Sequence, residues 1–188
     1  SKDKIREITG WQGQLVSLLE LKGFGGYAPY HTMKNGGFLG SHIDHTCIKD
    51  EELIKVANCI FYANRSWDSN WGGETVFFDR TGFFERDRVS PLPNRMLYFT
   101  HDVEGFHGVS DIDCPDSVVR RSFYMDFYVK ADDLESFQKA FFMKTSQKYK
   151  HAPCLTTFIP VPKHRGKINF KALLARSTLG YIRNYVKY

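Results

Sequence analysis

Short runs of β-branched and aromatic residues dominate the middle of the chain, from Tyr30 to about Ala131. Clusters of Gly, Pro, Asn and Asp separate these runs, of which the clearest are residues 55–63, 74–78, 95–100 and 118–129. This rhythm is typical of antiparallel strands joined by turns. It predicts an all-β sandwich or barrel as the body of the protein.

Apolar residues recur at helical spacing on both sides of this β region. Residues 11–21 predict a short helix. Asp132 and Glu135 have the spacing of a capping box, and apolar positions continue the helical pattern to about residue 148. A last helix is expected over about residues 170–186. Residues 153–162 hold three prolines, which indicates a loop between these two helices.

The 188 residues correspond to one domain. We expect residues 1–27 to form a helix and loop that support the β core. Residues 28–131 are expected to form that core, and residues 132–188 a helical appendage of the same domain.

Charge is distributed unevenly along the chain. All 21 acidic residues lie at or before Glu135, whereas residues 136–188 contain 11 Lys and Arg and no acidic residue. The basic C-terminal segment suggests an anionic partner, either an anionic substrate that it guides or an anionic polymer. No run of about 18 apolar residues occurs, so no membrane span is expected. The four cysteines form no CxxC pair, which favours reduced thiols and a cytoplasmic location.

A possible metal site begins at His42 and Asp44. In a strand, residues two apart face the same side, so this imidazole and this carboxylate would converge. His107 lies 63 residues after Asp44 and could supply a third ligand. Two His and one carboxylate form the facial triad of non-heme Fe(II) oxygenases. Taken alone, a His-x-Asp sequence is also compatible with a polar strand end beside a loop.

The context of His42 and Asp44 narrows these alternatives. Five segments occur in order along the chain. They are residues 30–39, the His-Ile-Asp segment at 42–44, Cys59–Trp67, Gly72–Phe77, and Pro91–Phe99, which leads to His107-Gly108-Val109. Arg120-Arg121-Ser122-Phe123 then opens the last strand. This set resembles the prolyl-4-hydroxylase-like group of Fe(II)- and 2-oxoglutarate-dependent dioxygenases. The resemblance covers about residues 28–130, and the segment from Ile60 to Trp67 is especially similar to the hypoxia-sensing prolyl hydroxylases.

The resemblance implies a mainly β fold, the double-stranded β-helix or jelly roll, with flanking helices. It implies that His42, Asp44 and His107 bind iron. A basic residue of the last strand and a tyrosine at the position of Tyr62 would bind the distal carboxylate of 2-oxoglutarate. An arginine suits that carboxylate because its guanidinium donates two parallel hydrogen bonds.

Two neighbouring arginines are candidates for this role. The family pattern favours Arg120, because Ser122 follows two residues later. Alternation along the strand agrees, since Arg120, Ser122, Tyr124 and Asp126 share a polar face, whereas Arg121 belongs to an apolar face that should meet the helices. We therefore expect Arg120 to bind the co-substrate and Arg121 to have a structural role.

The implied activity is hydroxylation of an unactivated C–H bond, with succinate and CO2 as co-products. Fe(II), 2-oxoglutarate and O2 would be required, with ascorbate as a candidate reductant. Hypoxia-type enzymes carry Trp where this chain has Asp126, which puts peptidyl-proline as the substrate in doubt. The demethylases of nucleic acids carry a second Arg there, so nucleic acid is disfavoured. The alternatives are a catalytically silent jelly-roll binding module and a protein that binds anionic polymers through its basic segment.

Overall fold

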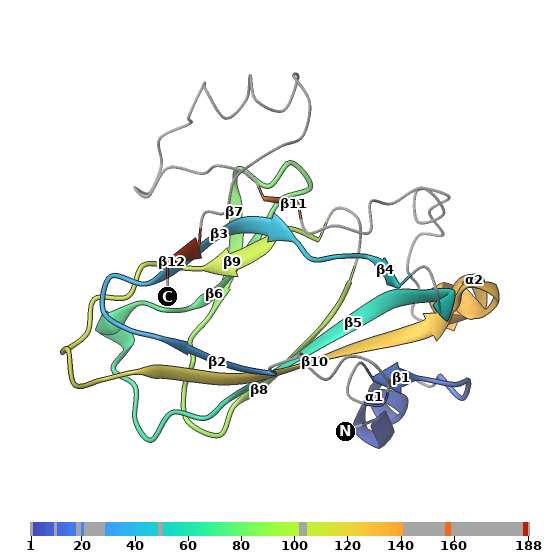
Figure 1. Ribbon diagram of the computed structural model, residues 1–188, viewed down its shortest axis with the longest axis horizontal. Coiled ribbons are helices and arrows are strands. Elements are labelled where there is room, and N and C mark those ends of the chain that lie inside the picture. Colours follow the sequence, from blue (N-terminus) through green and yellow to red (C-terminus); the bar gives the residue numbers. More distant parts are fainter. Residues whose placement is uncertain are drawn as a thin grey trace.

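Two antiparallel sheets face each other, and short helices lie outside one of them (Figure 1). This computed structural model describes residues 2–9, 11–17, 20, 29–48, 51–101, 105–140, 157–158 and 186–187. The described part is therefore mainly β, as the sequence predicts. Among the described residues, no helix has the length and apolar character that crossing a membrane requires.

The first sheet is built on four strands in the order β2, β10, β5 and β8. Their bounds are Tyr30–Met33, Arg120–Lys130, Leu53–Tyr62 and Met96–Thr100, respectively. Two short strands complete the sheet: β1 (Val16–Ser17) pairs with β10, and β4 (Cys47–Ile48) pairs with β5.

The second sheet is built on β3, β9, β6 and β7, which span Phe38–Ile43, His107–Val109, Thr75–Phe78 and Glu85–Val89. Two further short strands pair with β3, namely β11 (Thr157–Phe158) and β12 (Val186–Lys187). A short 3-10 helix, η3 (Ser69–Trp71), lies on the connection from β5 to β6.

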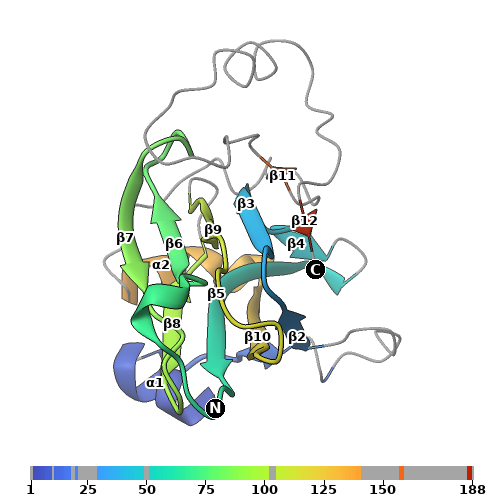
Figure 2. The ribbon, with the colours of Figure 1, turned by 90° about the vertical axis from the view of Figure 1, so that its left-hand side faces the viewer.

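The chain passes between the two sheets almost every time that it forms a new strand (Figure 2). β2 lies in the first sheet and β3 in the second, β5 in the first and β6 and β7 in the second. β8 then returns to the first sheet, β9 to the second, and β10 closes the first. This winding is that of a jelly roll, so the expected double-stranded β-helix is confirmed. The space between the sheets is where polar side chains of facing strands can converge.

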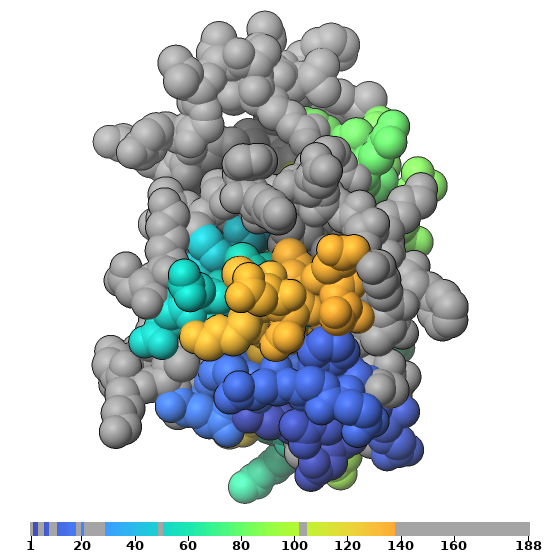
Figure 3. Space-filling view, turned by 90° about the vertical axis from the view of Figure 1, so that its right-hand side faces the viewer, coloured from blue at the N-terminus to red at the C-terminus, as the bar shows by residue number. Residues whose placement is uncertain are grey.

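The outer face of the first sheet carries the main apolar core. Trp11 and Leu15 from the N-terminal segment and Phe137 from α2 (Leu134–Ala140) pack on buried side chains of β5 and β10. The rings of Trp11 and Phe137 meet edge to face, with centroids 5.5 Å apart. Figure 3 shows α2 lying beside the N-terminal segment on this side of the molecule. The apolar face expected for β10 therefore does meet the helical layer.

The helix expected over residues 11–21 is wrong. The N-terminal helix is instead α1 (Lys2–Thr9), and Val16 and Ser17 form β1 against Tyr128 and Phe127 of β10. The apolar spacing of this segment serves a different purpose from the one predicted. Leu15 packs into the core, while the residues that follow it form backbone hydrogen bonds to the sheet. These tertiary contacts outweigh the weak helical propensity of the segment.

The helices predicted for the C-terminal part can be compared with the structure only over a few residues. The capping-box position at Asp132 lies inside a 3-10 turn, η4 (Ala131–Asp133), and the α-helix begins at Leu134. Val186 lies in strand β12 rather than in a helix. The rest of the predicted helices and of the basic segment, residues 141–156 and 159–185, falls outside the described residues.

The cysteine prediction also needs a correction. Cys59 and Cys114 are free and buried, but Cys47 is disulfide-bonded. A disulfide depends on two Cα atoms lying within about 7 Å of each other. Spacing along the sequence does not report that proximity.

Candidate metal centre

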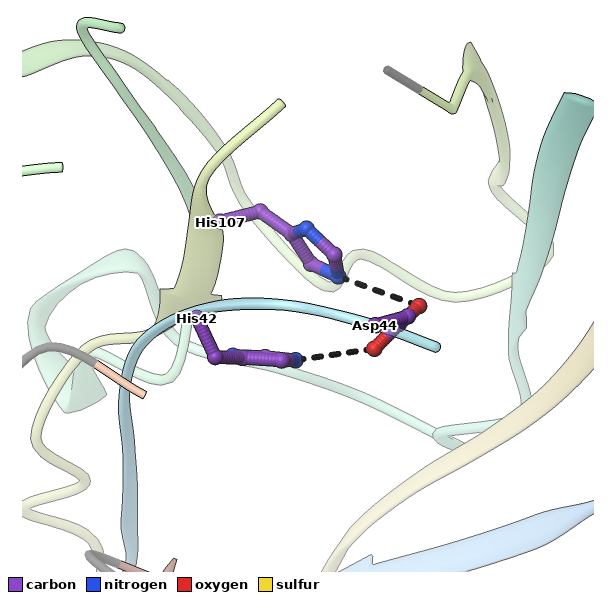
Figure 4. A group of neighbouring side chains, drawn as sticks. All are labelled: His42, Asp44 and His107. Atoms are coloured by element: carbon purple, nitrogen blue, oxygen red, sulfur yellow. Dashed lines mark ion pairs between the residues drawn. The ribbon is translucent and has the colours of Figure 1, made fainter. Parts of the chain in front are cut away.

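His42, Asp44 and His107 come together between the two sheets (Figure 4). Each offers one nitrogen or oxygen atom, and these three atoms all lie within 4.8 Å of one another. Asp44 Oδ1 is 3.1 Å from Nε2 of His42, and Asp44 Oδ2 is 3.6 Å from Nε2 of His107. Neighbouring ligands held ~2.1 Å from one metal ion at right angles are about 3 Å apart, so the three groups are spaced as ligands of a single ion would be.

Strand pairing brings these residues together. His42 near the end of β3 lies directly opposite His107 at the start of β9. Asp44 follows β3, one residue after the strand ends at Ile43. The three candidates predicted from the sequence are thus neighbours in space, although Asp44 reaches the centre from a strand end and not from within the strand.

Each imidazole is oriented by a backbone carbonyl close by in the sequence. His42 Nδ1 is 2.9 Å from the carbonyl oxygen of Gly40, and His107 Nδ1 is 3.1 Å from that of Gly105. With the proton on Nδ1, each ring donates to its carbonyl and presents the lone pair of Nε2 to the centre. This second hydrogen bond is the usual way in which a ligating histidine is oriented.

The protonation states also suit a metal site. Burial, together with the charge of the nearby His42, lowers the pKa of His107 to about 4. For Asp44, burial alone would raise the pKa, but the charges of Lys55 and His107 and a hydrogen bond from His42 hold it well below its usual value. At neutral pH the centre therefore contains a neutral His107 and an ionised carboxylate, as metal binding requires.

The carboxylate of Asp44 is further held by two side chains of β5. Lys55 Nζ and Asn58 Nδ2 each donate to Asp44 Oδ2 over 2.8 Å. Lys55 also lies 2.9 Å from Asp126 Oδ1. Burial acts against the charge on Lys55, but the two carboxylates outweigh it and raise the pKa of the ammonium group. Burial raises the pKa of Asp126 in turn, against the opposing effect of Lys55.

A cavity of about 300 Å³ opens beside this centre. Its wall includes the three candidate ligands, Arg120 and Ser122 at the start of β10, and Thr75 at the start of β6. It also includes Asn58, Lys55, His45 and Asp126. The Arg120 side chain is only 3% exposed. Its Nε donates to the carbonyl of Gly73 over 2.8 Å, and its Nη1 donates to Ser122 Oγ over 3.2 Å.

Arg121 points away from this cavity. It is half-buried, and its Nη1 donates to the carbonyl of Val119. Arg120 therefore faces the cavity and Arg121 does not, which is the arrangement that strand alternation predicts. Tyr124, four residues after Arg120 on the same face of β10, packs against His31, with ring centroids 4.2 Å apart and ring planes tilted by 45°.

Tyr62, the second residue expected to bind the co-substrate, lies next to Arg120 and Thr75. It is completely buried and does not line the cavity. Its ring lies beneath Arg120, with the guanidinium carbon 5.3 Å from the ring centroid. Its hydroxyl shares a hydrogen bond of 2.7 Å with Thr75 Oγ1. The hydroxyl of Tyr62 thus lies one hydrogen bond from the hydroxyl that Thr75 brings to the cavity wall, and its contact with the co-substrate stays a prediction.

Sequence reasoning missed Thr75, Lys55 and Asn58. A signal existed for Lys55, since a lysine within the apolar run of residues 53–62 is unusual in a buried strand. Thr75 begins the strand after the Gly72-Gly73 turn, where a polar residue has no distinctive pattern. His45, not expected to be a ligand, lines the cavity outside the group of three, and its Nε2 is 2.6 Å from the hydroxyl of Tyr128.

The chemistry of this donor set fits one class of metal ion. Two imidazoles and one carboxylate leave three positions of an octahedral ion open, as in non-heme Fe(II) sites. The cavity beside them has a buried guanidinium that no carboxylate of the described residues neutralises. The site therefore offers a metal-binding face and, in the same cavity, a binding position for an anion.

Comparison with known proteins gives one family match. The model of the 2OG-Fe(II) oxygenase superfamily matches residues 27–128, more than half of the chain and nearly the whole jelly roll. A comparison with curated proteins gives no match.

Solved structures with a similar fold include two groups of prolyl hydroxylases. One is a prolyl-4-hydroxylase of Pseudomonas putida, with 22% identity, a TM-score of 0.39 and coverage of 54% of this chain and 49% of that one. The other comes from the prolyl 4-hydroxylases of Phytophthora capsici, with 20% identity, a TM-score of 0.39 and coverage of 60% and 39%. The matched part thus spans half or less of the length of these neighbours.

Proposed function

This chain belongs to the 2OG-Fe(II) oxygenase superfamily, and we propose that it is a 2-oxoglutarate-dependent dioxygenase that hydroxylates an unactivated C–H bond. Succinate and CO2 would be the co-products. One observation carries the proposal: the group of His42, Asp44 and His107 shares a cavity with the buried guanidinium of Arg120. A metal and a dianionic co-substrate could therefore be bound side by side.

His42, Asp44 and His107 would hold Fe(II), which with O2 and 2-oxoglutarate supplies the oxidising chemistry of this reaction. The chain itself supplies orientation and protonation state. Gly40 and Gly105 fix the two rings through their Nδ1 atoms. The lowered pKa of His107 keeps its Nε2 lone pair free at neutral pH.

Arg120 would bind the distal carboxylate of 2-oxoglutarate. A charged guanidinium that is buried without a carboxylate partner is costly, and an incoming anion removes that cost. The hydroxyls of Thr75 and Ser122 lie next to it and can donate to the same carboxylate. Tyr62 would bind the same carboxylate, and the proposal is supported by its place beside Arg120 and by the hydrogen bond between its hydroxyl and Thr75 Oγ1 at the cavity wall.

The substrate would approach from the other end of β10. Arg120 and Asp126 lie six residues apart on this strand, a distance of about 20 Å, and both line the cavity. A co-substrate that reaches from the metal to Arg120 leaves the Asp126 end free. That end is polar, with Asn58, Lys55, His45 and Asp126 in its wall, so a polar substrate fits it better than a purely apolar one.

The test is anaerobic addition of Fe(II) and 2-oxoglutarate to the purified protein. Chelation of the metal by the 2-oxo acid should produce a visible charge-transfer band that neither reagent produces alone. If the protein binds Fe(II) but no band appears when 2-oxoglutarate is added, the proposed co-substrate is wrong. Release of succinate under air, with and without candidate substrates, would then indicate the substrate class.

A pair of histidine variants tests the metal ligands. His107→Ala should lose Fe(II) binding and the release of succinate. His31→Gln alters a histidine of the same cavity outside the group of three, so it should keep Fe(II) binding. If His107→Ala retained both properties, a different residue would be the third ligand.

The remaining parts of the proposal concern the protein as a whole. We propose O2 as a co-substrate and ascorbate as the reductant, and a division of the chain into a supporting N-terminal segment, a jelly-roll core and a basic C-terminal appendage. A cytoplasmic location stays a prediction, and the disulfide of Cys47 counts against it.

A further inference from the structure

Lys55 is a lysine placed where lysines rarely occur. It lies inside β5 between apolar residues and is 1% exposed. Removing an ammonium group from water costs several kcal/mol unless the group is paired and hydrogen-bonded. An apolar residue at this position would be buried without that desolvation cost. The contacts of the ammonium group therefore indicate the role of a lysine here.

The ammonium group links two carboxylates that belong to different parts of the fold. It is 2.8 Å from Asp44 Oδ2, at the end of β3 in the second sheet. It is also 2.9 Å from Asp126 Oδ1, on β10 in the first sheet. Asp126 is 2% exposed and does not belong to the group of three candidate ligands. Its contact with Lys55 therefore gives the ammonium group a second carboxylate partner besides Asp44.

A bulge in β5 makes this arrangement possible. Tyr128 pairs with Lys55 and Phe127 pairs with Ala57, so Val56 is an extra residue between them. In a regular strand, residues three apart face opposite sides. The bulge cancels one alternation, and Lys55 and Asn58 both reach the same oxygen of Asp44.

The two oxygens of Asp44 are therefore not equivalent. Oδ2 accepts hydrogen bonds from a charged ammonium group and from an amide, each over 2.8 Å. Oδ1 lies 3.1 Å from His42 Nε2 and accepts neither of these two hydrogen bonds, whereas Oδ2 lies 3.6 Å from His107 Nε2. An oxygen that accepts two hydrogen bonds has both of its lone pairs engaged, so a metal would have to displace one of the donors. Oδ1 is the oxygen that remains available for coordination.

We propose that Lys55 is a positioning residue that makes Asp44 a one-oxygen ligand, with Asp126 anchoring the ammonium group and Asn58 assisting it. This inference rests on the proposed function. A carboxylate that binds a metal through both oxygens takes one more coordination position. With Lys55 in place, three positions stay open, two for the 2-oxo acid and one for O2.

The test replaces the buried pair as a unit. Removing Lys55 alone would leave Asp126 charged and unpaired in the interior, which could prevent folding. The double variant Lys55→Met/Asp126→Asn removes both charges at nearly constant volume. Lys130→Met is the matched control, because Lys130 is an exposed lysine of β10 that donates to the backbone of Glu51.

Co(II) serves as the probe, because its visible spectrum reports coordination and it is stable in air. The readouts are the Co(II) spectrum, the Co(II) dissociation constant and the dissociation constant of 2-oxoglutarate for the Co(II)-loaded protein. In the double variant we expect the spectrum to change, Co(II) to stay bound and 2-oxoglutarate to bind at least about tenfold more weakly, a loss of ~1.4 kcal/mol. Lys130→Met should match the wild type in all three.

Asp126→Asn alone provides a second route to the same answer. An amide of the same size keeps the packing but holds the ammonium group less strongly, so it should shift the same readouts in the same direction by less. The proposal is overturned if either variant is folded and binds Co(II) and 2-oxoglutarate with the wild-type spectrum and affinity. If instead the wild type binds Co(II) but no 2-oxoglutarate, the proposed function itself fails.

Discussion

The cavity side of β10 begins with an arginine that is charged, buried and held in place by neutral groups. Burial lowers the pKa of Arg120, but a guanidinium stays protonated in proteins. Its hydrogen bonds go to Gly73 and Ser122. The guanidinium of Arg120 is therefore preorganised to bind an anion.

Replacing this guanidinium should weaken co-substrate binding specifically. Hydrogen bonds to charged groups contribute about 1.5–3 kcal/mol each, so Arg120→Gln should raise the dissociation constant of 2-oxoglutarate by about 10- to 100-fold. Fe(II) binding should persist. Arg121→Gln is the control and should leave both constants unchanged, since Arg121 faces away from the cavity. Titration of the charge-transfer band gives the dissociation constant of 2-oxoglutarate for each variant. If Arg121→Gln raised this constant as much as Arg120→Gln, the assignment of Arg120 as the specific ligand of the co-substrate would be wrong.

Acid should destabilise the metal-free protein through His107. Its pKa is about 4 in the folded state and about 6.5 in an unfolded chain. Between these values the unfolded chain binds a proton that the folded protein does not bind, so the free energy of unfolding falls as the pH drops below about 6.5. Loss of this contribution between pH 7 and pH 5 amounts to about 2 kcal/mol.

His107→Gln isolates this contribution, because glutamine does not titrate. Urea unfolding of the metal-free proteins at pH 7 and pH 5 should show a smaller loss of stability in this variant than in the wild type. His101, whose pKa burial also lowers well below its usual value, would still contribute to both. An identical pH dependence in the two proteins would contradict the lowered pKa of His107.

At the level of elements, the pairing of β3 with β9 sets the spacing of the two imidazoles. The backbones approach closely beside His107: a Cβ added at Gly108 would lie 2.5 Å from the carbonyl oxygen of Leu39. Real Cβ atoms do not come that near to a backbone oxygen. Glycine at this position thus allows the two ligand strands to lie side by side.

Gly108→Ala should therefore separate the ligand strands and impair metal binding. We expect a loss of stability in the range of ~1–3 kcal/mol, typical of forced overpacking, together with a weaker affinity for Co(II). Thr32→Ala, at an exposed position of β2, controls for the effect of alanine in a strand. Thermal unfolding and Co(II) titration give the two readouts. Wild-type Co(II) affinity in a folded Gly108→Ala protein would show that this close approach does not set the site.

On the scale of the whole molecule, the fold keeps stability and chemistry on opposite faces of one sheet. The outer face of the first sheet packs against α2 and the N-terminal segment, and the inner face lines the cavity. Alternation along β5 and β10 separates the two sets of side chains. A change in the outer core should therefore affect stability more than the site.

Phe137→Ala tests this separation. Phe137 is completely buried against Trp11, so its truncation should cost about 3–5 kcal/mol. At a temperature where the variant is still folded, its affinity for Fe(II) and 2-oxoglutarate should stay within about twofold of the wild type, a difference of less than ~0.5 kcal/mol. A large loss of affinity in the folded variant would show that the helical layer is coupled to the cavity.

Much of the fold and of the candidate site could be predicted from local patterns. The strand rhythm between residues 30 and 131 is a short-range property of the chain, and it predicts the β architecture correctly. Two-residue alternation was sufficient to distinguish Arg120 from Arg121. The grouping of His42 with Asp44 follows from their separation by one residue, and His107 was found through its family context.

Other features depend on contacts that no local pattern contains. The N-terminal segment 11–17 pairs with a sheet edge that residues more than a hundred positions later provide, so its apolar spacing was misread as helical. Tyr62 lies beside Arg120, and its hydroxyl shares a hydrogen bond with Thr75 of the opposite sheet. The bulge at Val56 arises where β5 pairs with β10. It places Lys55 on the face of β5 that contacts Asp44.

The sequence by itself determined which residue types could carry the chemistry and, in a regular strand such as the first half of β10, on which face they lie, because side-chain alternation is a property of the backbone of each strand. Only the tertiary structure decided how these side chains are held. The orientation of Asp44 depends on a bulge, on a lysine from one sheet and on a carboxylate from another strand. These groups meet because the two sheets close around a shared interior, where a charge must find partners within a few ångströms.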